Sequence, residues 1–342
     1  MIYSKQIDKK YTDYINKILN DKSEKLVLLI SFFYVIIKNN LNKNGDKMKE
    51  HGLTLLSEGQ IWGNSSEPRL EVIRKYGIKS AITDLCVLTG SYLREDTIDE
   101  DRSLTGRTSC FWTRSDDDDN DVRMVDENGI RSYIYRCKRS GTVRPALQSS
   151  VIFSQISPNR VMGYNGIEEV EYGEYPQNAA DSRMQNILES EYNRGMNKTG
   201  RSYTFDSVKY DDYDTGFKPV TYEEYEYQGK KYIRIKANSD FDGWKFKLSN
   251  GVKYRDGDYV WVEVSPVKWL IDDKTGILIS KKGLVSGIRF LNKSTNYKGD
   301  FSKTEMKEYL DRYMSKELFQ TTKTKETVNE EEIINPYKLK FE

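Results

Sequence analysis

The chain has 342 residues, enough for one large domain or two ordinary ones, each with its own core. Its 54 Lys and Arg residues nearly balance its 53 Asp and Glu residues, and the net charge of +1 excludes a global field that would attract nucleic acid or an anionic membrane. Aromatic residues make up 12% of the chain and provide enough apolar area to exclude disorder over most of it.

Cysteine and histidine are scarce. Cys86, Cys110 and Cys137 are an odd number in a long chain, which is not a disulfide framework, and they favour a reducing, cytoplasmic location over a cell surface or a virion. His51 is the only histidine, so a His-based zinc site or a catalytic triad would depend on it. The sequence also lacks the phosphate-loop, dinucleotide-binding, metalloprotease and hydrolase motifs. We therefore expect no cofactor and no enzymatic activity.

Residues 1–45 are predicted to form a helical hairpin. Apolar residues recur at helical spacing over 4–20, and a strongly apolar run follows at 26–37. That run is shorter than the roughly 20 residues that cross a bilayer, so we expect a buried helix and no membrane span. A membrane anchor or a signal sequence is the alternative. The polar stretch at 41–52 is typical of a linker.

Residues 53–150 are predicted to contain one short helix followed by strands. Ser66 is a candidate N-cap for this helix, with Gly77 as its stop. The strands occupy 108–148, where Asn128-Gly129 is a hairpin signal between two runs of strand-forming residues.

Residues 164–320 are predicted to be mostly strand. Turn chemistry at Gln228-Gly229 and at 272–276 separates pairs of strands. Asp181 is a candidate cap for a helix over about 181–194, and a capping box at Ser302 and Glu305 predicts a second helix. The tail at 321–342 is charged, and we expect it to be loose.

Two motifs connect the chain with a known family. The first is Trp112-Thr113-Arg114-Ser115 and the second is Val143-Arg144-Pro145-Ala146-Leu147. Together they resemble the C-type-lectin-like domains of the formylglycine-generating-enzyme/sulfatase-modifying superfamily, and more closely a branch common in Firmicutes and their phages. Four later segments resemble the opening half of the same domain type: 171–177, 266–271, 278–284 and 306–314.

The resemblance implies an α+β, strand-rich C-type-lectin-like fold with its halves in inverted order. Residues 53–150 are similar to the closing half and residues 164–320 to the opening half, although the opening half usually comes first. This order implies a circular permutation, which is tolerated where termini lie close together at the surface. Two incomplete copies are the alternative.

The resemblance also places a recognition surface before the second motif, where relatives diversified by retroelements vary. The corresponding residues are Arg131, Tyr133, Tyr135, Arg136, Lys138 and Arg139. If Ile134 points inward, strand alternation directs both tyrosines outward, and Tyr and Arg suit adaptable recognition. An ordinary strand with a solvated charged face is the alternative. Nucleic-acid binding is disfavoured because the acidic residues 116–121 come shortly before.

Three residues of the motifs are expected to stabilise the fold. In lectin-like domains a Trp at the position of Trp112 usually fills the core, and Arg114 can brace a loop by pairing with a carboxylate. Arg144 is expected to be structural as well. The copper-binding cysteine pair of the formylglycine-generating members has no match at Cys110 and Cys137.

The acidic run is a weak calcium candidate. Asp116, Asp118 and Asn120 offer oxygen ligands at alternate positions, and Glu127 stands where the bidentate Glu of an EF-hand loop would. The sixth position is Asp121 instead of the required Gly, and no helix frames the run. We therefore expect a solvated acidic loop and no metal site.

These observations predict a non-catalytic module of a bacterium or phage that binds a protein or glycan ligand through a variable polar and aromatic surface near 131–140. The alternative is an intracellular interaction protein that inhibits a host or defence complex through the helical hairpin at the N-terminus.

Overall fold

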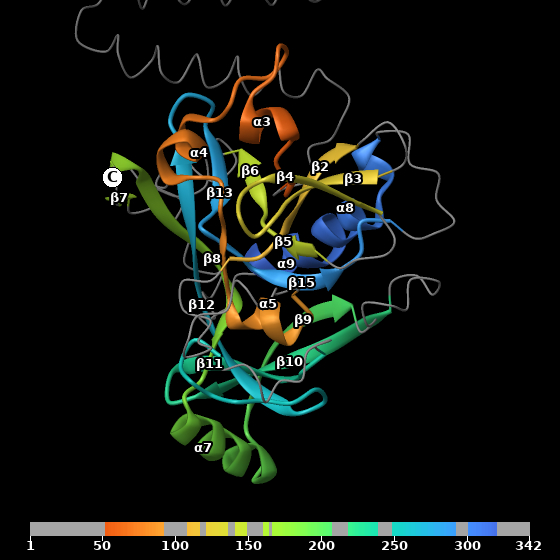
Figure 1. The fold of residues 1–342 in the computed structure, drawn as a ribbon. Helices are drawn as coiled ribbons and strands as arrows, with labels where there is room; N and C mark the ends of the chain where they lie inside the picture. Colours follow the sequence, from red (N-terminus) through yellow and green to blue (C-terminus); the bar gives the residue numbers. More distant parts are fainter. Residues whose placement is uncertain are drawn as a thin grey trace, which may run out of the picture. The chain divides into compact units, whose positions relative to one another are not determined.

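A computed structural model of the chain describes residues 52–91, 108–116, 121–135, 141–148, 160–163, 166–206, 218–238, 248–291 and 300–319. All belong to the second of the two units into which the chain divides, Glu50–Glu342. The hairpin expected at 1–45 and the tail at 321–342 lie outside these residues. The described part is strand-rich and of the α+β class, as expected (Figure 1).

The largest sheet has eight strands and is built around β12 (Tyr259–Asp272). The other strands are β6 (Ala146–Gln148), β7 (Arg160–Met162), β8 (Glu168–Ala179), β9 (Lys198–Asp206), β10 (Pro219–Tyr227), β11 (Lys230–Lys236) and β13 (Ile277–Ser280). β12 pairs with β11, β8 and β13 along its length, and all three pairings are antiparallel. Pro266 lies at a register shift against β8, where a strand interior accepts proline.

The second sheet has five strands in the order β15-β5-β2-β3-β4. Their bounds are β2 (Phe111–Asp116), β3 (Asp121–Val125), β4 (Arg131–Tyr135), β5 (Gly141–Val143) and β15 (Val285–Ile288). A short parallel pair joins β1 (Ala81–Ile82) to β14 (Lys282–Gly283). Each of the three sheets therefore contains strands from both segments that the sequence distinguishes, 53–150 and 164–320.

Turn chemistry explains the hairpins. The side chain of Asp126 accepts hydrogen bonds from the N–H groups of Asn128 and Ile130, and Gly129 has a φ of 79°, so the β3–β4 turn forms where the sequence predicts it. Gln228 and Gly229 both have positive φ, as a two-residue hairpin turn between β10 and β11 requires.

Two short helices, α3 (Glu58–Trp62) and α4 (Glu71–Tyr76), come before the five-stranded sheet in sequence. The prediction of Ser66 as a helix cap is wrong, because Asn64 accepts hydrogen bonds from the N–H groups of Ser66 and Glu67 and keeps this stretch in a loop. The helix α4 begins later and ends at Gly77, as expected.

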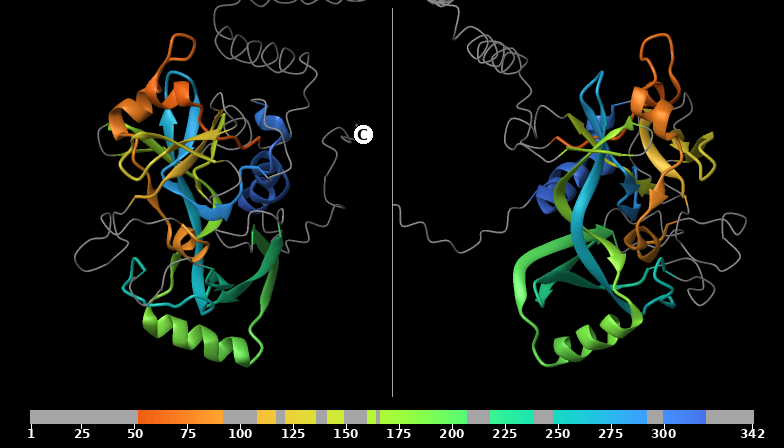
Figure 2. Two further views of the ribbon diagram at one scale, coloured as in Figure 1. Left: turned by 45° about the vertical axis from the view of Figure 1, so that its right-hand side comes forward. Right: turned by 90° about the vertical axis from the view of Figure 1, so that its left-hand side faces the viewer.

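The predicted Asp181 cap is present on α7 (Ser182–Asn193), which lies at the opposite end of the unit from α3 (Figure 2).

The C-terminal helical segment is divided into η4 (Phe301–Lys303), α8 (Glu305–Tyr309), the π-helical turn η5 (Leu310–Met314) and α9 (Ser315–Phe319). The predicted capping box at Ser302 is wrong. Asp300 caps η4 first, and Thr304 then caps α8 by accepting a hydrogen bond from the Lys307 N–H over 3.0 Å.

The hydrophobic core draws on both sequence segments. Its main cluster includes Leu85 of α5 (Asp84–Leu88) and Trp112 together with Ile233, Trp269 and Phe290. The buried carboxylate of Asp84 also links the segments, because it accepts hydrogen bonds from the N–H groups of Ala179 and Ser249 over 2.8 Å each. Among the described residues, no helix is long and apolar enough to cross a membrane.

Candidate recognition surface

Three arginines lie on three adjacent strands of the five-stranded sheet. Arg114 is on β2, Arg123 on β3 and Arg131 on β4. Backbone contacts hold the start of α3 against this part of the sheet. The Arg114 N–H donates to the Leu56 carbonyl over 2.9 Å, and the Glu58 N–H donates to the Ser115 hydroxyl over 2.9 Å.

Glu58, the first residue of α3, holds two of these arginines. Its Oε1 lies 2.8 Å from Nη2 of Arg131, and its Oε2 lies 3.5 Å from Nε of Arg123. A capping box fixes the helix start, because the Ser57 hydroxyl accepts from the Gln60 N–H and the Gln60 side chain accepts from the Ser57 N–H. The local sequence therefore determines where α3 begins, and the packing of α3 on the sheet brings the carboxylate of Glu58 to the two arginines.

Trp62, the last residue of α3, supports Arg131 from the same helix. The guanidinium carbon of Arg131 lies 5.2 Å from the centroid of the Trp62 ring. Glu58 and Trp62 are four residues apart and so share a helix face. Contacts of this kind at exposed sites contribute about 0.5–1 kcal/mol, so their main effect is to orient the guanidinium.

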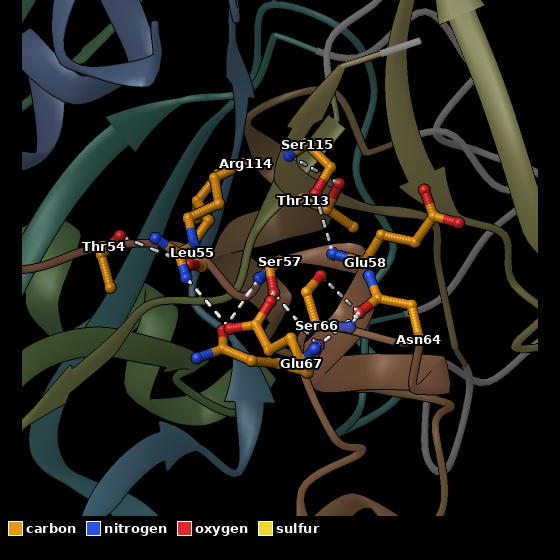
Figure 3. A network of polar contacts seen from close by, with 11 residues as sticks. Thr54, Leu55, Ser57, Glu58, Asn64, Ser66, Glu67, Thr113, Arg114 and Ser115 are labelled. Carbon is orange, nitrogen blue, oxygen red and sulfur yellow. Dashed lines mark hydrogen bonds and ion pairs between the residues drawn. The ribbon is translucent and has the colours of Figure 1, made fainter. Parts of the chain in front are cut away.

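Glu67 extends the network to the third arginine (Figure 3). Its Oε1 lies 3.5 Å from Nη2 of Arg114, and its Oε2 accepts a hydrogen bond from the Ser57 hydroxyl. Ser57 thus connects the cap of α3 to the carboxylate that faces Arg114. Arg114 thus lies beside a carboxylate of a loop, with one contact instead of the bidentate pairing that the sequence suggests.

We call Glu58, Trp62, Glu67, Arg114, Arg123 and Arg131 the arginine cluster. Its three arginine side chains are between 21% and 46% exposed, and Arg131 is the most exposed of them. Groups that are exposed yet already held in place lose little conformational freedom when a ligand binds. The cluster offers donors for carboxylates and other acceptors, together with one aromatic ring.

The other residues predicted to carry recognition follow Arg131. Tyr133 and Tyr135 lie on β4, where the register pairs them with Arg123 and Asp121. The predicted binding residues Arg136, Lys138 and Arg139 lie outside the described residues. The structure therefore joins Arg131 to the cluster and brings the backbone of the two tyrosines next to it.

Trp112 and Arg144 lie in the core. The fully buried Trp112 donates its indole N–H to the Ile288 carbonyl over 3.3 Å. Arg144 is also buried, and it donates to the carbonyls of Ser280 and Ile78 over 3.0 Å and 3.4 Å. Burial lowers the pKa of Arg144 to about 10, so it keeps its charge at neutral pH. Both side chains connect the first sequence segment to residues 280–288.

The residues of the calcium candidate are spread over the β2–β3 hairpin. Asp116 pairs with Val122 near the start of β3, whereas Glu127 follows the other end of that strand. Asp118 and Asn120 lie outside the described residues. Within the described part of the chain, no group of three His, Cys, Asp or Glu residues could hold a metal ion.

Sequence reasoning missed Glu58, Trp62, Glu67 and Arg123. A local signal for the first two is present in the sequence, since Ser57 and Gln60 have capping-box spacing. No local signal indicates that Glu58 meets Arg131, because the two are far apart in the chain. Comparison of the chain with known protein families, with curated proteins and with solved structures gave no match in any of the three.

Proposed function

We propose that this chain is a non-catalytic binding module that engages a protein or glycan ligand through the arginine cluster and β4. The observation that carries the proposal is the setting of Arg131. Its side chain is 46% exposed, yet its guanidinium contacts both Glu58 and Trp62. Arginine and tryptophan side chains presented in this way are typical of interface hot spots.

The sequence beside the cluster supports the same role. Tyr133 and Tyr135 follow Arg131 on β4, and three basic residues follow β4 in the sequence. Tyrosine supplies rigid contact area at low entropic cost, and arginine supplies directed hydrogen bonds.

We further propose that the fold is C-type-lectin-like, with its halves in permuted order as the motifs imply. The mixed composition of the sheets supports this proposal. β5 pairs with β15 and β6 pairs with β13, so neither segment closes a sheet of its own at these edges.

The proposed function is tested by selecting ligands for the wild-type protein from a displayed peptide library and from a glycan array. Binding of a selected ligand should weaken by about 1 kcal/mol or more in each of Arg131→Ala, Tyr133→Ala and Tyr135→Ala. The free energies of unfolding of the two Tyr variants should change by no more than about 0.5 kcal/mol, because recognition residues add little to packing. Arg131→Ala also loses its contacts with Glu58 and Trp62 and should cost up to about 2 kcal/mol of stability. Trp112→Ala should do the reverse and cost about 3–5 kcal/mol of stability.

Arg194→Ala is the matched control, because this arginine is 72% exposed and follows α7 at the other end of the unit. It should leave ligand affinity unchanged. If the three variants bind as the wild type does, or if the Tyr substitutions unfold the protein, β4 is not the recognition surface and the N-terminal hairpin becomes the next candidate.

A further inference from the structure

β4 is the last strand of its sheet. In the order β15-β5-β2-β3-β4 it pairs with β3 through all five of its residues and, among the described strands, with no other. At alternate residues of an edge strand, the N–H and C=O groups point away from the sheet and can pair with another chain.

The edge strand β9 of the eight-stranded sheet differs from β4, because a side chain binds its backbone. The Thr204 N–H of β9 donates to the carboxyl oxygen Oε1 of Glu317 over 2.7 Å, and α9 packs against that strand. Side chains thus use an outward backbone group of β9. Within the described residues, β4 is paired along one side only, by β3. Of the two edges, β9 and β4, the edge of β4 is therefore the one to which a further strand can add.

The side chains near the start of β4 favour an anionic partner. Arg131 lies at the start of β4, and its side chain is the most exposed of the three arginines in the cluster, so its positive charge is accessible to an anion. Asp126 in the hairpin turn is engaged by two turn N–H groups. Asp116 and Asp121 lie toward the other end of the hairpin, since Asp116 pairs with Val122 and Asp121 with Tyr135, while Arg131 pairs with Val125.

Arg131 has donors for such a partner. Arg131 contacts Glu58 through Nη2. The other N–H groups of a guanidinium can bind a second carboxylate, and two parallel hydrogen bonds form when the two groups align. Because Trp62 and Glu58 fix the side chain, this second carboxylate would meet a preoriented group.

We propose that an extended, acidic segment of a partner protein adds to β4 as a further strand of the five-stranded sheet, with one of its carboxylates bound by Arg131. This inference rests on the proposed function, because it names the partner of the same surface. Main-chain pairing supplies affinity in this mode of recognition, and the side-chain contact supplies specificity.

The test measures fluorescence anisotropy with a labelled peptide of alternating Glu and Val. Three further peptides are compared with it: a Lys-for-Glu analogue and two versions N-methylated at alternate residues in opposite phases. A paired strand uses one set of alternate N–H groups, so one methylated peptide should bind at least about tenfold more weakly and the other should bind like the parent. The Lys analogue should lose binding.

Arg131→Gln should weaken binding of the acidic peptide at least about fivefold, while Arg194→Gln should not. Equal binding of the two methylated peptides, equal binding of the Glu and Lys peptides, or no binding of the acidic peptide at millimolar concentration would overturn the added strand. If a glycan or a folded ligand nevertheless depends on Arg131, the proposed function is intact and only this inference fails. If no selected ligand depends on Arg131, both fail.

Discussion

Glu317 of α9 is a carboxyl group with almost no access to water. Its Oε1 accepts a hydrogen bond from the Thr204 N–H over 2.7 Å, and Arg201 donates to its backbone carbonyl over 2.8 Å. Burial raises the pKa of Glu317 to about 8, although the Thr204 N–H and the charge of Arg201 oppose the shift. The carboxyl is therefore protonated in the folded protein at neutral pH and ionised in the unfolded chain.

The stability of the fold should fall as the pH rises from about 4.5 to about 8. In this window the folded state keeps a proton that the unfolded chain releases, so the free energy of unfolding drops by up to about 1.4 kcal/mol per pH unit. Glu317→Gln keeps an oxygen for the Thr204 N–H and cannot ionise. It should flatten this dependence and exceed the wild type in stability at the alkaline end, as measured by urea unfolding across the window.

Glu308→Gln is the control for this experiment, because Glu308 lies on the neighbouring helix α8 with a side chain that is 62% exposed. It should leave the pH dependence of unfolding as it is in the wild type. A Glu317→Gln variant with the wild-type dependence would show that this carboxyl is ionised in the folded protein.

At the scale of elements, the turns and helix caps that could be predicted from sequence are those whose conformation depends on residues close by in the chain. The Asn128-Gly129 and Gln228-Gly229 turns and the Asp181 cap each depend on side chains or positive φ angles within a few residues of the element. Such chemistry can be recognised without tertiary information.

Elements with competing local signals, and sites assembled from distant residues, could not be predicted in the same way. Ser302 has the spacing of a capping box, but Asp300 forms a turn of 3-10 helix there and delays the α-helix to Thr304. The arginine cluster depends on Glu58 meeting Arg123 and Arg131, which only the packing of α3 on the sheet determines. The lectin-like fold itself stays a prediction.

The competition between Ser302 and Thr304 predicts a difference in stability. The Thr304 hydroxyl accepts from the Lys307 N–H over 3.0 Å and donates to the Phe301 carbonyl over 2.8 Å, whereas the hydroxyl of exposed Ser302 donates to the carboxylate of Asp300. Thr304→Ala should therefore reduce the free energy of unfolding by about 1 kcal/mol, and Ser302→Ala should stay within about 0.5 kcal/mol of the wild type. Urea unfolding measures both. Equal losses would contradict the assignment of Thr304 as the cap.

At the scale of the described unit, the two sequence segments depend on each other. β6 pairs with β13, β5 with β15 and β1 with β14. The indole of Trp112 and the guanidinium of Arg144 reach across to the carbonyls of Ile288 and Ser280. Separating the segments would therefore expose strand edges, part of the core and the two buried donors together.

This interdependence predicts the behaviour of the isolated segments. Residues 53–150 and 164–320, expressed separately, should each lack a sharp melting transition, because each would lose strand partners and leave apolar core surface in water. Mixed or co-expressed, they should associate and recover one cooperative transition, which calorimetry would detect. A single chain of residues 53–320 is the reference for the temperature and enthalpy of this transition. Two sharp and independent transitions from the separate segments would show that each is an autonomous domain, and a single permuted fold would then be wrong.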